Sequence, residues 1–178
     1  MEAVFFVVVG MLTIAHSDYL LERLGAKALG LAGAVVAIVL LALVLFPPVP
    51  MYTEASKAAL VTLMLAWATA GAVMAGAYLY GYDERMVGRY ALGLAVVSLF
   101  LGTYFLVGDW TDPATISYPA GAVTLLLAVV AATTHLVIIC RPPFAPPKQF
   151  VGLVTMASGA VVLVIGLLAL VGVVGLAA

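Results

Sequence analysis

Six apolar runs divide this sequence, and each is long enough to cross a lipid bilayer as a helix. The hydrocarbon layer is about 30 Å thick, so a helix that rises about 1.5 Å per residue needs roughly 20 residues to span it. Charged or proline-containing segments separate the runs, because proline cannot continue a helix. The runs cover residues 3–21, 26–46, 58–80, 87–107, 117–140 and 150–174.

Composition excludes a soluble fold. Only 8% of the residues are charged and 66% are hydrophobic, with a mean hydropathy of +1.29, whereas a soluble domain is about one quarter charged. A chain of 178 residues cannot bury that much apolar surface. We therefore predict an all-α integral membrane protein: a bundle of six transmembrane helices in a single domain over 1–178, with no soluble domain. Because His16 and Asp18 interrupt the first run, a bundle of five helices is the alternative.

Basic residues concentrate in alternate loops, which predicts how the helices are oriented. Cytoplasmic loops of membrane proteins are enriched in lysine and arginine. The loops after the first, third and fifth runs contain most of the basic residues, namely Arg23, Lys27, Arg85, Arg89, Arg141 and Lys148. We predict that these three loops are cytoplasmic, that both termini lie outside, and that the protein is a multi-pass protein of the cell membrane.

Several classes of function are excluded by what the sequence lacks. A net charge of −1 and the absence of a basic run argue against a nucleic-acid partner. A single cysteine, Cys140, excludes an internal disulfide and a cysteine-based zinc site. No phosphate-binding loop, dinucleotide fingerprint, zinc-protease helix or serine-hydrolase elbow occurs. We expect no enzymatic activity and, in the preferred interpretation, no metal or cofactor.

Two histidines are the most informative polar residues inside the predicted spans. His16 precedes Arg23 by seven positions and His135 precedes Arg141 by six, so both imidazoles are expected at similar depth. Ionisable groups at depth are costly in hydrocarbon and mark candidate functional sites. Three interpretations stay open: structural hydrogen bonds, the lining of a solute path, or the two axial ligands of a haem b.

Other polar and small residues add weaker indications. Trp67 on the third run and Thr134 beside His135 are further candidates for the lining of a path. Asp18 is either an interfacial residue or part of a vestibule or gate. Small residues spaced four apart allow close helix packing within or between subunits, and they favour a homo-oligomer; on the third run they are Ala68, Ala72 and Gly76.

Two short segments resemble a known family. They are Val9-Gly10-Met11-Leu12-Thr13-Ile14-Ala15-His16 on the first run and Gly81-Tyr82-Asp83-Glu84-Arg85, followed by Tyr90, before the fourth. With its size and topology, the chain resembles the small six-helix urea channels and short-chain amide transporters. The resemblance implies a ring-shaped hexamer and passage of urea or a short amide. It also has departures: Ala66-Trp67-Ala68-Thr69-Ala70 stands where the family has an aromatic-rich pore segment, and the fifth run contains no tryptophan.

Two functions from different classes follow. The first is a passive channel or facilitator for a small neutral solute such as urea, because no Asp, Glu, Lys or Arg lies mid-span and selectivity in such a pore comes from its diameter and a few polar groups. Its path would be lined by His16, Trp67, Thr134 and His135. The alternative is a membrane anchor or accessory subunit that binds other membrane subunits, with haem b held by the two histidines or without a cofactor.

Overall fold

The computed structural model describes residues 2–46, 54–108, 118–140 and 145–173. Those residues form six helices and no strand. All six are long and apolar enough to span a membrane, which confirms the six-helix prediction; the five-helix alternative is wrong. The helices are α1 Glu2–Leu20, α2 Ala26–Leu45, α3 Glu54–Tyr80, α4 Arg85–Val107, α5 Tyr118–Ile139 and α6 Lys148–Leu170. Predicted ends at residues 117 and 174 lie outside the described residues.

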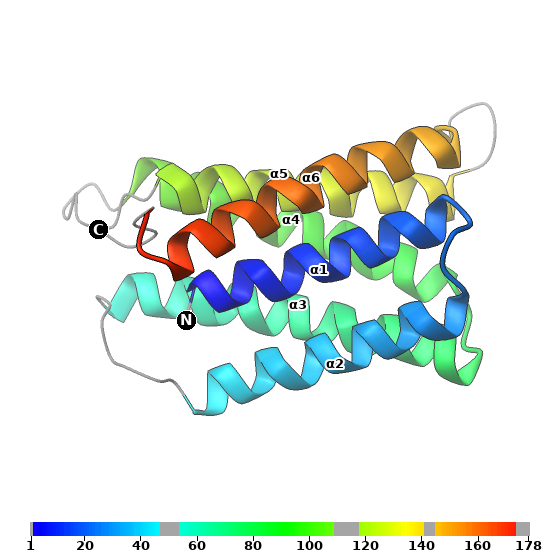
Figure 1. The fold of residues 1–178 in the computed structure, drawn as a ribbon, viewed down its shortest axis with the longest axis horizontal. Helices are drawn as coiled ribbons and strands as arrows, with labels where there is room; N and C mark the ends of the chain where they lie inside the picture. Colours follow the sequence, from blue (N-terminus) through cyan, green and yellow to red (C-terminus); the bar gives the residue numbers. More distant parts are fainter. Residues whose placement is uncertain (1, 47–53, 109–117, 141–144, 174–178) are drawn as a thin grey trace.

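The helices form a closed ring in chain order. Each helix contacts the next one along the chain, and α6 packs along α1 to close the ring (Figure 1). The closest pairs are α1 with α6, α2 with α3, and α4 with α5. Additional contact between α1 and α3 brings these two helices together inside the ring. The bundle therefore encloses one axis, which runs along the expected membrane normal.

Alternate loops lie at the same end of the bundle. The connections after α1 and α3, the end of α5 and the start of α6 lie together at the end opposite the N-terminus (Figure 1). This placement gathers Arg23, Lys27, Arg85 and Lys148 at one membrane face, whereas Arg141 lies outside the described residues. Which side of the membrane that face occupies stays a prediction from the positive-inside rule.

Glycine allows the closest contact between α2 and α3. A Cβ built on Gly71 would lie 2.5 Å from the Gly33 carbonyl oxygen, and one built on Gly33 would lie 2.7 Å from the Gly71 oxygen. Both distances are shorter than van der Waals contact, so only glycine permits this approach of the two backbones. Glycines also make close contacts in the other two tight pairs, at Gly10 and Gly166 between α1 and α6 and at Gly102 between α4 and α5.

The predicted small-residue stripe on α3 is only partly buried within the subunit. Ala68 is buried and Gly76 is half-buried, but Ala72 is exposed, so the three residues do not form one buried contact line. The close approach on α3 occurs at Gly71 instead. Packing of this stripe against another subunit stays a prediction.

Candidate functional site on the axis of the bundle

Three of the predicted residues line one small cavity on the axis. His16 of α1, Trp67 of α3 and Thr134 of α5 border a cavity of about 20 Å³, together with apolar side chains and Thr13. Residues of α4 complete the wall, at Ala91 and Leu94. His16 is 2% exposed, while Trp67 and Thr134 are each 3% exposed. The cavity thus lies in the interior of the bundle between α1, α3, α4 and α5, with a mainly apolar wall that includes these three residues.

Helical periodicity places these residues on the faces that meet at the axis. On α3, Trp67, Met74 and Tyr78 are separated by seven and four residues, which puts them on one face. On α1, Leu12, His16 and Tyr19 are separated by four and three. Each of these two helices therefore directs one continuous stripe of side chains toward the axis.

Hydrogen bonds to neighbouring helices hold the turns that carry the site. The Ser17 hydroxyl donates to the Gly152 carbonyl oxygen of α6 over 2.7 Å, next to His16 in the chain. The Tyr90 hydroxyl of α4 donates to the Ala66 carbonyl oxygen over 3.0 Å, next to Trp67. In hydrocarbon such bonds satisfy polar groups that would otherwise be costly, and here they also position the site.

The polar groups at the cavity are incompletely paired. His16 Nε2 lies 3.3 Å from the Thr134 hydroxyl oxygen. Within the described part of the chain, His16 Nδ1 and Trp67 Nε1 are buried without a hydrogen-bond partner. Buried polar atoms are normally satisfied, and an unpaired one costs about 1–3 kcal/mol. Two unpaired nitrogens beside one cavity point to a hydrogen-bonding guest.

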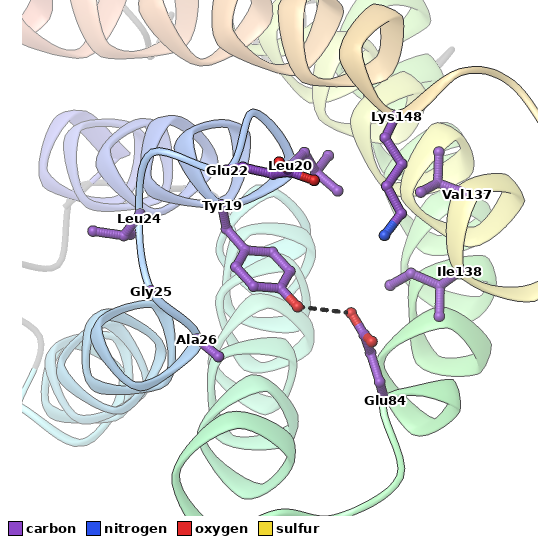
Figure 2. Close-up of a pocket in the computed structure, with 10 residues that line it drawn as sticks. All are labelled: Tyr19, Leu20, Glu22, Leu24, Gly25, Ala26, Glu84, Val137, Ile138 and Lys148. Carbon is purple, nitrogen blue, oxygen red and sulfur yellow. Dashed lines mark hydrogen bonds between the residues drawn. The ribbon is translucent and has the colours of Figure 1, made fainter.

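A wider pocket opens at the membrane face that holds the loops after α1, α3 and α5. Its volume is about 450 Å³, and its wall contains Tyr19, Glu22, Glu84 and Lys148. Figure 2 shows the Tyr19 hydroxyl, the Glu84 carboxylate and the Lys148 ammonium group pointing toward a common space. We call this pocket the vestibule.

Two tyrosines lie next to residues of both the vestibule and the axial cavity. The Tyr78 and Tyr19 hydroxyls both donate to Glu84 Oε1, over 2.8 and 3.3 Å, and their ring centroids lie 5.0 Å apart. Tyr19 lines the vestibule, and its ring lies 6.4 Å from the His16 ring, which lines the cavity. Tyr78 follows Met74, another cavity residue, by one helical turn. The tyrosine pair and Glu84 therefore lie where a path between the two spaces would pass, and we call these three residues the constriction.

The structure places the other two candidates away from the cavity. His135 is half-buried, and its Nδ1 donates to the Gly88 carbonyl oxygen of α4 over 2.8 Å. Asp18 is partly exposed, and its backbone carbonyl oxygen accepts from the amides of Arg23 and Leu24 in the loop after α1. Neither residue belongs to the walls described for the cavity or the vestibule.

The geometry does not favour the haem alternative. Cofactor sites are typically roughly 300–1,000 Å³ in volume, whereas the cavity beside His16 measures about 20 Å³. The ring of His135 lies against α4 instead of facing that cavity. Haem binding stays a prediction of the sequence, and an absorption spectrum of the purified protein would test it.

Sequence reasoning missed the constriction and the vestibule. Tyr19, Tyr78 and Glu84 lie near predicted span ends, where aromatic and charged residues are common at the membrane interface. The available signal was the spacing of the two tyrosines. Tyr19 follows His16 by three residues and Tyr78 follows Met74 by four, so each extends an axial stripe, on α1 or α3, by about one turn. A search for continuous stripes, instead of single polar residues, would have found the two tyrosines.

No protein-family model and no curated protein matches the sequence. Solved structures do match. The crystal structure of the urea channel from Helicobacter pylori superimposes with a TM-score of 0.73, covering 97% of this chain and 98% of that chain at 14% identity. This chain has the urea-channel fold. A cryo-EM structure of the Helicobacter pylori urea channel in a closed state gives the same TM-score and identity, over 96% of this chain and 98% of that one.

The urea-channel fold confirms the resemblance predicted from the sequence. The match covers nearly the whole chain, so all six helices and their order correspond. At 14% identity the match shows a shared fold alone, and residue roles must be argued from this chain's own geometry. In this chain the fold contains the vestibule at one end and the small axial cavity in its interior.

Proposed function

We propose that this protein is a passive membrane channel for a small neutral solute, with urea and short amides as the preferred class. The observation that carries the proposal is the buried cavity on the axis, where His16, Trp67 and Thr134 meet between four helices. The likeness in fold to the Helicobacter pylori urea channel supports it. Burying two unpaired nitrogens in a membrane bundle is costly, and binding a polar solute in transit would offset that cost.

The proposed path runs from the vestibule through the constriction to the axial cavity. The charged groups at the vestibule keep that mouth hydrated, while the axial walls beyond are apolar except for the three cavity residues and Thr13. An ion would lose its hydration in such a path without charged partners, whereas a neutral solute loses only hydrogen bonds that the site can replace. The path therefore favours neutral over charged solutes.

Solute uptake by vesicles tests the function. Liposomes containing the purified protein, mixed with hyperosmotic urea or acetamide, should shrink and then reswell faster than protein-free liposomes, as followed by light scattering. Liposomes containing the Ala131→Met variant provide a control with the same lipid and protein content. If swelling with urea, acetamide and glycerol matches that of protein-free liposomes, the channel proposal fails. Purification with stoichiometric companion subunits would then favour the accessory-subunit alternative.

Removing the Glu84 carboxylate is expected to raise urea permeability several-fold. Both tyrosine hydroxyls donate to Glu84 Oε1, and a hydrogen bond to a charged group contributes about 1.5–3 kcal/mol. Without that shared acceptor, the Tyr19 and Tyr78 rings are free to separate and the constriction widens. Glu84 makes no side-chain capping bond to α4, so Glu84→Ala leaves the helix start intact.

Glu22→Ala is the matched control for Glu84→Ala. Glu22 also lines the vestibule, so its removal changes the local charge by the same amount, but it is not a partner of the tyrosine hydroxyls. Swelling rates of the two variants are compared in the same lipid at equal protein content. An equal increase in both variants would show that Glu84 acts only through vestibule charge, and its proposed role in holding the two tyrosines together would be wrong.

A further inference from the structure

Thr134 uses its hydroxyl differently from most threonines in this protein. The hydroxyls of Thr13, Thr62, Thr69, Thr103, Thr124 and Thr133 each donate to a carbonyl oxygen four residues earlier in their own helix. The Thr134 hydroxyl instead contacts His16 Nε2, at 3.3 Å. A buried hydroxyl proton needs an acceptor, and among the described residues the imidazole nitrogen is its partner. Donation from Thr134 to Nε2 is the arrangement that pairs this proton.

That donation determines which nitrogen of His16 carries the proton. A neutral imidazole has one N–H donor and one acceptor, and the hydrogen bond at one nitrogen decides the tautomer. With Nε2 accepting from Thr134, the proton lies on Nδ1. The second unpaired nitrogen, Trp67 Nε1, belongs to an indole, which only donates.

We propose that Thr134 fixes His16 as the Nδ1–H tautomer, so that two residues lining the axial cavity, His16 and Trp67, each keep an unpaired N–H donor for the solute. The matching ligand group is an oxygen with two free lone pairs, such as the carbonyl oxygen of urea or an amide. Trp67 and His16 then determine specificity by contact with the solute, and Thr134 is a positioning residue. This inference deepens the proposed channel function and rests on it for the identity of the solute.

The cavity size agrees with recognition of a single oxygen atom. Its volume of about 20 Å³ is just above the roughly 10–15 Å³ that one water-sized group requires. The carbonyl oxygen fits there, while the rest of the solute needs space from neighbouring side chains. Met74 lines the cavity and is flexible and unbranched, so it can move to give that space.

Nitrogen NMR tests the tautomer independently of transport. His135 also has its proton on Nδ1, because a carbonyl oxygen can only accept, so spectra are recorded in a His135→Phe background with ¹⁵N-labelled histidine. We expect His16 to be protonated at Nδ1, and Thr134→Val to shift the population toward Nε2–H. A His16 protonated at Nε2 before the Thr134 change, or a tautomer population unaltered by that change, would overturn the proposal.

The ratio of urea to thiourea permeability tests the recognition of the acceptor. Thiourea keeps both amino groups but replaces the carbonyl oxygen by sulfur, a weaker acceptor. Reconstituted protein should favour urea, and Trp67→Phe should lower that ratio by about five-fold, as expected for one neutral hydrogen bond. Tyr104→Phe is the control, since its hydroxyl is also buried and unpaired in the described structure but lies outside the cavity wall.

The outcomes separate this inference from the channel function. Two results would overturn recognition of the solute oxygen by the N–H donors while leaving the channel function in place. One is protein-dependent flux that is equal for urea and thiourea. The other is the same urea-to-thiourea permeability ratio in Trp67→Phe as in the original protein. Absence of protein-dependent flux for both solutes would refute the channel and, with it, the solute identity. The NMR result would then still decide whether Thr134 sets the His16 tautomer.

Discussion

Replacing Ala131 by methionine is expected to reduce urea permeability by at least ten-fold. Ala131 is 2% exposed and lines the axial cavity of about 20 Å³. The longer side chain would occupy the space that a solute oxygen needs, and a cavity this small cannot hold both. The swelling rate of reconstituted liposomes in urea measures the loss. Ala91→Met, which enters the same cavity from α4, should give the same result.

Ala132→Met is the matched control. Ala132 is the next residue on α5, is half-buried, and is not part of the cavity wall, so the same change in composition should leave urea permeability within about two-fold of the original. Folding of each variant is checked by gel filtration in mild detergent and by thermal unfolding. Equal permeabilities of well-folded Ala131→Met and Ala132→Met proteins would mean that the solute does not pass through this cavity.

Gly71→Ala is expected to destabilise the bundle strongly, although it adds only one methyl group. The new Cβ would lie 2.5 Å from the Gly33 carbonyl oxygen, a backbone atom that cannot move without shifting α2. Overpacking of this kind typically costs about 1–3 kcal/mol, and separation of two helix backbones places the effect at the upper end. Reversible unfolding in mixed detergent, followed by circular dichroism, measures the change in free energy.

Gly93→Ala supplies the comparison for Gly71→Ala. Gly93 is exposed on α4 and a Cβ there meets nothing within 4 Å, so the substitution adds a methyl group at no steric cost. Alanine has a higher helix propensity than glycine, by about 1 kcal/mol in water. Gly93→Ala should therefore be neutral or stabilising. A Gly71→Ala protein as stable as Gly93→Ala would contradict the close α2–α3 contact.

The helices were predictable because hydrocarbon imposes a simple rule on the sequence. Every span must satisfy its backbone internally and present mainly apolar side chains, so charged and proline-rich breaks mark the ends. The same rule identified His16 and Thr134 as candidate site residues, since polar residues inside a span are rare. Their meeting at 3.3 Å across α1 and α5 confirms that His16 faces another helix within the bundle.

The path itself was not predictable because all faces of these helices are apolar. Lipid and a membrane-protein interior present similar environments, so hydrophobicity does not reveal which side of α3 faces the axis. Ala72 was expected in a packed stripe but is exposed, whereas Gly71 makes the contact. His135 was expected at a depth similar to that of His16 and was a candidate for the same path; its position around α5 places it against Gly88 instead.

The most direct test of the proposed function is the equilibrium distribution of radiolabelled urea in liposomes that contain this protein. No ion gradient or membrane potential is imposed, and internal and external urea are measured over time. For a passive path along the axis, urea should enter faster than in protein-free liposomes and stop when the two concentrations are equal. Uptake of urea no faster than through lipid alone would contradict a passive channel. In a second measurement with an ion gradient applied, accumulation of urea above its external concentration would also contradict it.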